Sequence, residues 1–418
     1  MLTKGLSKGT LPVQENALIT KRSIFVTDLT LDREFFFPEG EKIFSDSTES
    51  MLINLTSLKN ISENKDYSNI LFESINETQF KVIGNGEVFS SITSEKVEEY
   101  PVATERIYPI DLQVNGYLLE LAHDMLFAID KKTITPKFEC VSVNNGIMFA
   151  TDAQRLPFHK VSPLDFCTYE NYTDERIKSI NFLINYRIIN ALPKSTESPI
   201  HVLISDPDED KRYVKMIIDG ITYGFRMPID DPAKVKSVIP QGNLFSMVMY
   251  EPSITANLKM AISMNPHAVD LSWSDENPEY LFFRSDNLDT NEFFSFKSKL
   301  IKIPKGIKRF KFQYNPSYLM QMIGFEKSKY IDVHFSHQRC AIMLFKHGLL
   351  MNKYISEEVC EVIKPIEEPK EIEPDKGKEE PNGTEKQNAP DQPIEDRGAE
   401  QKEHSGIEPN YNFENERE

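Results

Sequence analysis

One pattern of residues recurs in this chain at domain-sized intervals, and such a recurrence limits the fold to tandem copies of one unit. Pro12 is followed 16 residues later by Asp28, and the apolar runs between them end in a Thr-Asp pair. Pro136 and Asp152 repeat this spacing 124 residues further on. A weaker third copy ends at Asp286, after another 134 residues. Three copies at such offsets favour tandem duplication over coincidence.

The local patterns within each repeat predict an α+β fold. Two pairs of short alternating or β-branched runs flank Asn-Gly or Asp-Gly turns, which is typical of hairpins. These runs are 80–83 with 86–89, and 214–218 with 220–223. Apolar residues spaced by three and four predict helices at 117–126, 184–192 and 318–323. We therefore expect largely antiparallel sheets backed by a few helices.

The bulk composition excludes several classes of protein. A length of 418 residues predicts two to four domains. The sequence contains no run of 18 apolar residues and no signal peptide at its start, so we expect no contact with a membrane. Four cysteines without a Cys-x-x-Cys pair make no disulfide framework, which indicates a reduced, cytoplasmic protein.

The net charge of -17 is concentrated at the C-terminal end. Residues 356–418 contain 20 acidic and 8 basic side chains, which leaves only -5 for the first 355 residues. The tail is rich in Glu, Pro, Lys, Asn and Gln, and such a segment cannot bury enough apolar surface to offset its ordering entropy. We expect it to be disordered, either as a solubilising extension or as an internal competitor for a binding site.

Three strings in the repeats resemble the bacterial DNA polymerase III beta subunit, the sliding clamp family. Segment 10–29, with its Thr-Leu-Pro and Thr-Asp-Leu, is similar to the family's first-domain pattern. Phe-Ala-Thr-Asp-Ala-Gln-Arg-Leu at 149–156 resembles the second-domain signature Ala-Thr-Asp-Gly-His-Arg-Leu. Tyr-Asn-Pro-Ser-Tyr-Leu at 314–319 resembles the third-domain Phe-Asn-x-x-Tyr-Leu. The resemblance covers residues 1 to about 353.

This resemblance implies three tandem DNA-clamp domains, at 1–103, 104–238 and 239–355, followed by the acidic tail at 356–418. A head-to-tail homodimer would form a ring, with antiparallel sheets outside and helices lining the hole. The implied function is that of a processivity factor in DNA replication, which encircles duplex DNA without reading its sequence. The implied partners are double-stranded DNA, a DNA polymerase catalytic subunit and a clamp loader. No enzymatic activity and no cofactor are expected.

The resemblance also assigns basic residues to the DNA-facing side. The helices expected there are 55–64, 115–128, 184–192, 253–264 and 316–326. The candidate DNA-binding residues on them or in nearby loops are Lys8, Lys59, Lys131, Lys132, Arg187, Lys194 and Lys259. Because lysines are mostly exposed in any protein, each of them also fits an ordinary solvated surface.

A cleft between the second and third domains takes short peptides in the family, and apolar anchors give such sites their affinity. The matching positions are Phe138, Thr151, Arg155, Leu156, Pro240, Asn315, Tyr318, Leu350 and Met351. Leu156 and Tyr318 also fit a reading as plain core residues. Ala153 and Gln154 replace the family's Gly and His, which predicts a different partner preference.

The ring interface is expected to pair a strand that contains Phe89 and Ile92 with a helix end that contains Ile262 and Met264. Ser91 and Ser263 stand where the family is often apolar, which predicts a weaker dimer. The family also begins with a strand and a helix, about 16 residues that have no counterpart before Thr10. Either the start of the sequence is misassigned or trimmed, or the first domain lacks that strand and helix.

Other classes of function remain as alternatives. His334, His337 and Cys340 have a spacing that suggests zinc, but two positions three apart on a strand point to opposite faces, so we expect no metal site. Phosphate-loop and hydrolase motifs are absent from the sequence, which leaves a hydrolase on a repeated α+β fold as a minor alternative. The main alternative is a clamp-fold scaffold that binds partner peptides without encircling DNA.

Overall fold

The computed structural model describes residues 15–63, 69–93, 96–101, 106–168, 172–206, 211–228, 232–240, 242–287, 289–336, 342–351 and 359–363. All of them belong to one compact unit, which spans residues 1–364. Lys8 and most of the tail predicted to be disordered lie outside the described residues. At its start the prediction is wrong, because Val359–Val362 form a strand that pairs with the last sheet of repeat 3. Among the described residues, no helix combines the length and the apolar character needed to cross a membrane.

Repeats 2 and 3 follow one plan: a strand, a helix, four strands, a second helix and three strands. Repeat 2 contains β8 Ile110–Val114, α2 Tyr117–Asp124, β9 Cys140–Asn144, β10 Ile147–Phe149, β11 Arg155–Lys160, β12 Phe182–Asn185, α4 Tyr186–Ala191, β13 Ile200–Ile204, β14 Lys211–Ile218 and β15 Ile221–Pro228. A short helix, α3 Asp174–Ser179, and the 3-10 turns η3 Met125–Ala128, η4 Pro136–Glu139, η5 Pro163–Asp165 and η7 Val235–Ser237 are additions to this plan.

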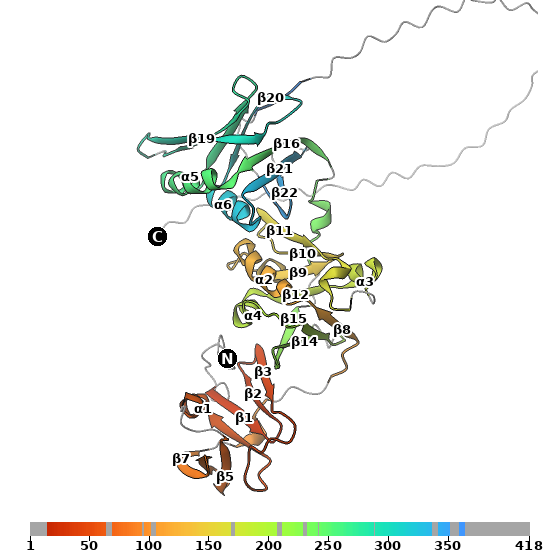
Figure 1. The fold of residues 1–418 in the computed structure, drawn as a ribbon, viewed down its shortest axis with the longest axis vertical. Coiled ribbons are helices and arrows are strands. Elements are labelled where there is room, and N and C mark those ends of the chain that lie inside the picture. The colour runs from red at the N-terminus through yellow and green to blue at the C-terminus, as the bar shows by residue number, and fades with distance from the viewer. Residues whose placement is uncertain are drawn as a thin grey trace, which may run out of the picture. The chain divides into compact units, whose positions relative to one another are not determined.

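Repeat 3 contains β16 Asn243–Tyr250, α5 Glu251–Met264, β17 Val269–Ser274, β18 Tyr280–Asp286, β19 Phe293–Lys302, β20 Ile307–Tyr314, α6 Pro316–Phe325, β21 Tyr330–Ser336, β22 Met343–Phe345 and β23 Gly348–Leu350. Helices α5 and α6 pack against each other (Figure 1). An additional strand, β24 Val359–Val362, pairs with β20. The predicted α+β class with antiparallel sheets is confirmed, since every pairing between named strands is antiparallel.

In repeat 1 the described residues match the plan only from its third element onward. They form β1 Asn16–Thr20, β2 Ser23–Thr27, β3 Leu31–Phe36, β4 Ser50–Asn54, α1 Leu55–Glu63, β5 Leu71–Asn76, β6 Gln79–Gly84, β7 Glu87–Thr93 and the turn η2 Val97–Glu99. In repeats 2 and 3 the first strand covers an edge of the second sheet, as β8 covers β13 and β16 covers β21.

The loop between β3 and β4 covers the corresponding edge of β5 in repeat 1. Phe44 makes a parallel bridge to Phe72, whose backbone N–H donates to the Ile43 carbonyl at 2.9 Å. The Asp46 carboxylate accepts from the backbone N–H of Ser74 at 2.9 Å. Ile43 and Phe44 are both buried in the core of this repeat. An unpaired sheet edge is a site for unwanted pairing, so the loop protects part of β5.

Helix starts follow from the capping chemistry of the sequence. Asn315 is the N-cap of α6, where its side chain accepts from the Tyr318 N–H at 3.1 Å, and Pro316 takes the first helical position. Asn185 caps α4 in the same way through the Arg187 N–H at 2.9 Å. The helix predicted at 184–192 therefore begins later, because Ile184 belongs to β12 and pairs with Val141 of β9.

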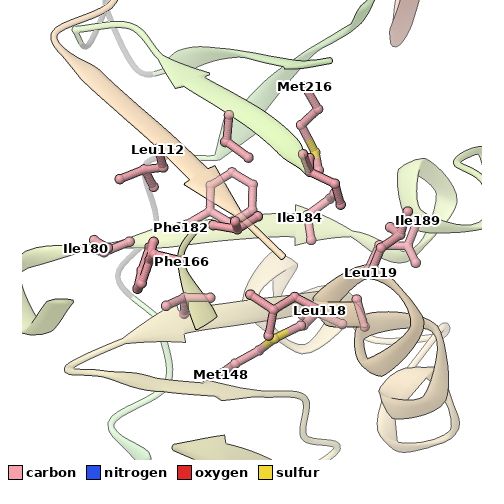
Figure 2. A pocket seen from close by; sticks show the side chains of 16 residues that line it. Leu112, Leu118, Leu119, Met148, Phe166, Ile180, Phe182, Ile184, Ile189 and Met216 are labelled. Carbon is pink, nitrogen blue, oxygen red and sulfur yellow. The ribbon is translucent and has the colours of Figure 1, made fainter. Parts of the chain in front are cut away.

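The core of repeat 2 contains an apolar cavity of about 100 Å³. Strands of both sheets and helix α2 contribute its walls, and Figure 2 shows Leu112, Leu118, Met148 and Met216 among its lining side chains. Protein interiors are normally close-packed, so an apolar cavity of this size loses dispersion contacts along its walls.

Candidate functional site

The recurring Thr-Asp pair forms the same turn in repeats 1 and 2. The Thr27 hydroxyl accepts from the Leu29 N–H at 2.9 Å, and Asp28 accepts from the next two N–H groups at 2.9 and 2.8 Å. The Thr151 hydroxyl accepts from the Ala153 N–H at 3.0 Å, and Asp152 again accepts from two N–H groups at 3.0 and 2.8 Å. These carboxylates accept hydrogen bonds from backbone N–H groups, which fits a structural rather than a catalytic role.

Ala153 takes the left-handed backbone conformation in this turn, with a φ of 67°. A side chain other than glycine costs free energy there, because its Cβ approaches the following carbonyl oxygen. The family signature has Gly at this position, so the substitution leaves strain in the wall of the candidate cleft.

Arg155 joins repeat 2 to repeat 3 through buried contacts. Its side chain is 7% exposed and forms an ion pair with Asp152, with 2.5 Å between Nη2 and Oδ2. It also donates through Nη1 to Gln321 of α6. The guanidinium lies 3.9 Å from the centroid of the Tyr318 ring and 5.5 Å from that of Phe127. Pairing and ring contacts compensate for the burial of this charge.

A cavity of about 230 Å³ opens beside this junction. Its walls are largely apolar and come from η4, the Thr-Asp turn with β11, the segment around η7, and β23. The lining residues are Phe138, Thr151, Ala153, Gln154, Arg155, Leu156, Ala233, Lys234, Val235, Val238, Leu349 and Met351. An apolar pocket with a few polar groups at its rim suits an apolar side chain of an extended peptide.

Five of the predicted cleft residues line this cavity: Phe138, Thr151, Arg155, Leu156 and Met351. Four others do not. Asn315 caps α6, and Tyr318 reaches the site through its contact with Arg155. Leu350 faces the core of repeat 3, because alternation along β23 turns Leu349 toward the cavity instead. Pro240 lies just beyond the lining segment.

The wall from Ala233 to Val238 was missed by the sequence interpretation, which treated this segment as the end of a domain. Its only signal was the apolar pair Val235 and Val238 close to Pro232 and Pro240. Val235 is buried in the cluster that also contains Phe149 and Leu156. Apolar residues in a connecting segment do not by themselves distinguish a pocket wall from a packed linker.

The predicted DNA-binding residues that the structure describes are all exposed: Lys59, Lys131, Lys132, Arg187, Lys194 and Lys259. Two of them share one aromatic ring. Lys131 Nζ lies 5.6 Å and the Arg187 guanidinium 5.8 Å from the centroid of Tyr186 at the start of α4. A hydrogen bond from Arg187 to Tyr186 raises the pKa of this guanidinium.

Two other cations near the helices are paired with acids. Lys59 has Glu63 at 3.7 Å on the same helix. Lys327, which follows α6, lies 2.5 Å from Asp124 and 3.3 Å from Glu120 of α2, and the hydrogen bond to Asp124 raises its pKa. Lys327 therefore connects repeats 2 and 3 and is less available to an anionic ligand.

Of the His and Cys residues in the His-x-x-His-x-x-Cys segment, at which we expect no metal site, the structure describes only His334. His334 contacts Asn243 through Nδ1 at 3.0 Å and Asp332 through Nε2 at 3.6 Å. His337 and Cys340 lie outside the described residues. Within the ranges that the structure describes, no group of three His, Cys, Asp or Glu side chains is arranged to hold a metal ion.

Both junctions between repeats use one strand register. At the first, β3 pairs with β15, so that Leu31, Asp32 and Arg33 face Phe225, Gly224 and Tyr223. At the second, β11 pairs with β23, so that Arg155, Leu156 and Pro157 face Leu350, Leu349 and Gly348. Counted from the Thr-Asp turn, the paired positions of β3 and β11 are equivalent. The same strand pairing, in the same register, therefore joins repeat 1 to repeat 2 and repeat 2 to repeat 3.

Two equivalent edges have no such partner among the described strands. β19 is the counterpart of β3 and β11 in repeat 3, and β7 is the counterpart of β15 and β23 in repeat 1. β7 pairs only with β6, and β19 pairs along its length with β18 and touches β16 at its end. Of the predicted interface residues, Ile92 lies on β7, and Ile262 and Met264 lie near the end of α5, which packs against β19. The Phe89 side chain lies outside the described part.

Comparison with known proteins identifies the fold through solved structures and not through sequence. No protein-family model matches the sequence, and no curated protein is significantly similar to it. A solved structure of the DNA polymerase III subunit beta from Pseudomonas aeruginosa superposes with a TM-score of 0.66 at 15% identity, and the match covers 84% of this chain and 94% of that chain.

Two further structures agree. The DNA polymerase sliding clamp from Bacillus subtilis gives a TM-score of 0.66 at 16% identity, with 85% and 95% of the two chains covered. The beta subunit from Thermotoga maritima gives 0.63 at 16% identity, with the same coverage. The chain has the sliding-clamp fold, at an identity that reflects strong divergence.

Proposed function

We propose that this chain is a DNA sliding clamp, a non-enzymatic processivity factor whose two copies close head to tail around duplex DNA. The observation that carries the proposal is the repeated junction register, together with the two complementary edges that it leaves over. β7 of one copy and β19 of another would form the same junction a third time. Two such contacts pair all the free edges of a dimer and close it into a ring.

The register of this third junction follows from the first two. In β18–β19, Phe283 faces Phe296, as Phe25 faces Glu34 in β2–β3. Ser295 is therefore the counterpart of Arg33. In β6–β7, Val82 faces Ser90, as Met216 faces Tyr223 in β14–β15, which makes Ser90 the counterpart of Tyr223.

Because Arg33 faces Tyr223 at the first junction, Ser90 should face Ser295 of the second copy. Ile92 should then face the second copy's Phe293. This assignment keeps the predicted interface strand, but its direct partner is β19 rather than the end of α5 that contains Ile262 and Met264.

Charge supports the same head-to-tail arrangement. Residues 1–103 carry 10 basic and 16 acidic side chains, whereas residues 239–355 carry 14 basic and 10 acidic ones. β7 begins with Glu87, and β19 carries Lys297, Lys299 and Lys302. Opposite potentials at the two ends favour encounter of unlike ends and disfavour contact of like ends.

The proposed DNA contacts are the cations beside the helices, above all Lys131 and Arg187 around Tyr186. They would bind phosphates without reading sequence, as a clamp that slides requires. The cavity beside Arg155 would take an apolar anchor from a DNA polymerase or another replication partner. Lys234 at its rim favours peptides that carry an acidic residue next to the anchor.

Disulfide cross-linking tests the ring directly. The double variant Ser90→Cys/Ser295→Cys places thiols at positions that should face each other, and oxidation should yield a covalently closed dimer. The matched control Ser91→Cys/Ser295→Cys moves one thiol by a single residue, which turns it to the other face of the strand, and should cross-link far less. Each single variant, Ser90→Cys or Ser295→Cys, is oxidised alone to show how much cross-linking involves the native cysteines.

The topological test uses the same variant. Reduced protein is mixed with circular plasmid, oxidised, and separated from free protein in high salt. Protein that stays on the circle and is released when the plasmid is linearised encircles DNA. Equal loss from both forms by a cross-linked dimer would instead support the alternative, a clamp-fold scaffold that does not encircle DNA.

A further inference from the structure

The outer face of the first sheet of repeat 3 has a regular arrangement of cations and aromatic rings, of which the clamp proposal uses only the positive charge of β19. Buried residues alternate with outward-facing ones along β18, where Tyr280 and Phe282 flank buried Leu281. Lys297 and Lys299 face outward on β19, and Ser298 between them is buried. This face lies opposite the core that packs against α5 and α6.

The strand register places these side chains in two matching rows. In the first row, Lys297 faces Phe282, Phe282 faces Ser272, and Ser272 faces Lys311. In the second, Lys299 faces Tyr280 on β18, while Ser274 faces Arg309 on the other side of the sheet. Both rows contain a cation on β19, an aromatic ring on β18, a serine on β17 and a cation on β20.

Sequence composition makes this pattern unusual for the chain. Residues 293–311 carry seven basic side chains and no acidic one in a protein whose net charge is -17. Phe282 is 37% exposed, so its ring is accessible from solvent. The serines of β17 are small and leave room beside the rings.

We propose that this face of β17–β20 binds single-stranded nucleic acid, with bases stacked on Phe282 and Tyr280 and phosphates on the flanking cations. Stacking on aromatic rings together with a basic track is how proteins hold single strands without reading sequence. The two rings stand about 6.8 Å apart along the strand, twice the roughly 3.4 Å base step of duplex DNA. Each ring therefore suits one base of an extended strand, which a stacked duplex does not offer.

The cations of this face have weak internal partners. Lys299 lies 3.8 Å from Glu279, Lys311 3.4 Å from Asp270, and Arg309 2.5 Å from Glu361 of β24. Lys297 Nζ lies 4.3 Å from the centroid of the Tyr280 ring. The pairs of Lys299 and Arg309 are exposed and contribute little free energy, so a phosphate chain can replace their carboxylates. Glu361 is the acid that competes most directly, since β24 holds it beside Arg309.

The test is fluorescence anisotropy of a labelled ten-nucleotide oligo(dT) titrated with the full chain. Phe282→Leu keeps an apolar side chain but removes the stacking plane, and should weaken binding about tenfold. Tyr330→Leu removes another exposed aromatic ring of repeat 3, and should leave binding unchanged. Glu361→Gln frees Arg309, and should tighten binding about threefold or more.

Further arms separate this site from the proposed DNA contacts at the helices. In a Lys131→Gln/Arg187→Gln background, which lacks the phosphate contacts proposed at the helices, Phe282→Leu should still weaken oligo(dT) binding about tenfold. Lys297→Gln/Lys311→Gln should reduce the slope of log affinity against log salt by about 1.4, because two phosphate contacts are lost. The proposal is overturned if Phe282→Leu binds as tightly as the original chain, or if a duplex of equal length binds as well as the single strand.

Discussion

Filling the cavity of repeat 2 should stabilise the protein, and the volume of the cavity sets an upper limit on the gain in unfolding free energy. Val141 of β9 and Val202 of β13 both line the void, and the two strands belong to different sheets. At about 24 cal/mol per Å³, a void of about 100 Å³ corresponds to at most about 2.4 kcal/mol. Val141→Ile/Val202→Ile adds two methylene groups at about 0.8 kcal/mol each, so we expect a gain of about 1.6 kcal/mol.

Hydrogen exchange followed by mass spectrometry measures this gain where it arises. Peptides that contain β9 and β13 should exchange about 15-fold more slowly if they open through cooperative unfolding of the repeat, since 1.4 kcal/mol corresponds to a factor of ten. Peptides from β17 in repeat 3 should not change.

The matched control is Val214→Ile, a fully buried valine of the same repeat that does not line the void. Overpacking there should cost about 1–3 kcal/mol. If the double variant and Val214→Ile change exchange in the same direction, the void is not a packing defect and the reasoning fails.

Three further predictions concern single side chains. Ala153→Gly should raise the free energy of unfolding by about 1 kcal/mol, measured by urea denaturation, because it relieves the left-handed backbone. Burial raises the pKa of Asp32, which accepts from the Tyr213 hydroxyl, so the original chain should lose stability relative to Asp32→Asn as the pH rises from about 4 to 7. Lys327→Met removes the ion pair with Asp124 and should cost less than about 1 kcal/mol, with the difference vanishing in high salt.

The sign of the Asp32 prediction follows from the direction of the shift. A carboxyl group whose folded pKa is raised binds its proton more tightly in the folded state, so the stabilisation is complete at low pH and is lost as the pH rises through the folded pKa. Urea midpoints of both proteins at pH 4.5 and 7 measure the difference. A constant difference, or one that changes in the opposite sense, would show that the carboxylate is better solvated than its half-buried position on β3, beside the Tyr213 hydroxyl, implies. For Ala153→Gly, a lower midpoint would refute the strain argument.

The α+β class and the tandem arrangement could be predicted because they depend on local patterns. The Thr-Asp turn recurs with its own hydrogen bonds, and Asn315-Pro316 specifies a helix start from adjacent residues alone. The start of α4 was misplaced because a spacing of four residues from Ile184 to Ile188 fits both the end of a strand and the turn of a helix.

The candidate cleft was only partly predictable, because its walls come from segments that are distant in sequence. Leu349 rather than Leu350 faces the cavity, and this depends on how β23 pairs with β11, about 190 residues earlier. The register between two repeats is set by both strands together, so neither sequence specifies it alone. Gly224 illustrates this: a Cβ there would overlap the Tyr213 hydroxyl, which reaches across the junction to Asp32.

The two unpartnered edges, β7 and β19, have a genetic consequence if the ring forms as proposed. A copy whose β19 edge is blocked, for example by proline in place of Ser295, still offers an intact β7 edge to a normal copy. The mixed dimer has one sound junction and one gap, so it is an open arc. With equal amounts of both copies and random pairing, about three quarters of all dimers would contain at least one blocked edge. One allele with a blocked β19 edge should therefore be dominant-negative, because its product forms open dimers with the normal protein without affecting the normal copy's fold.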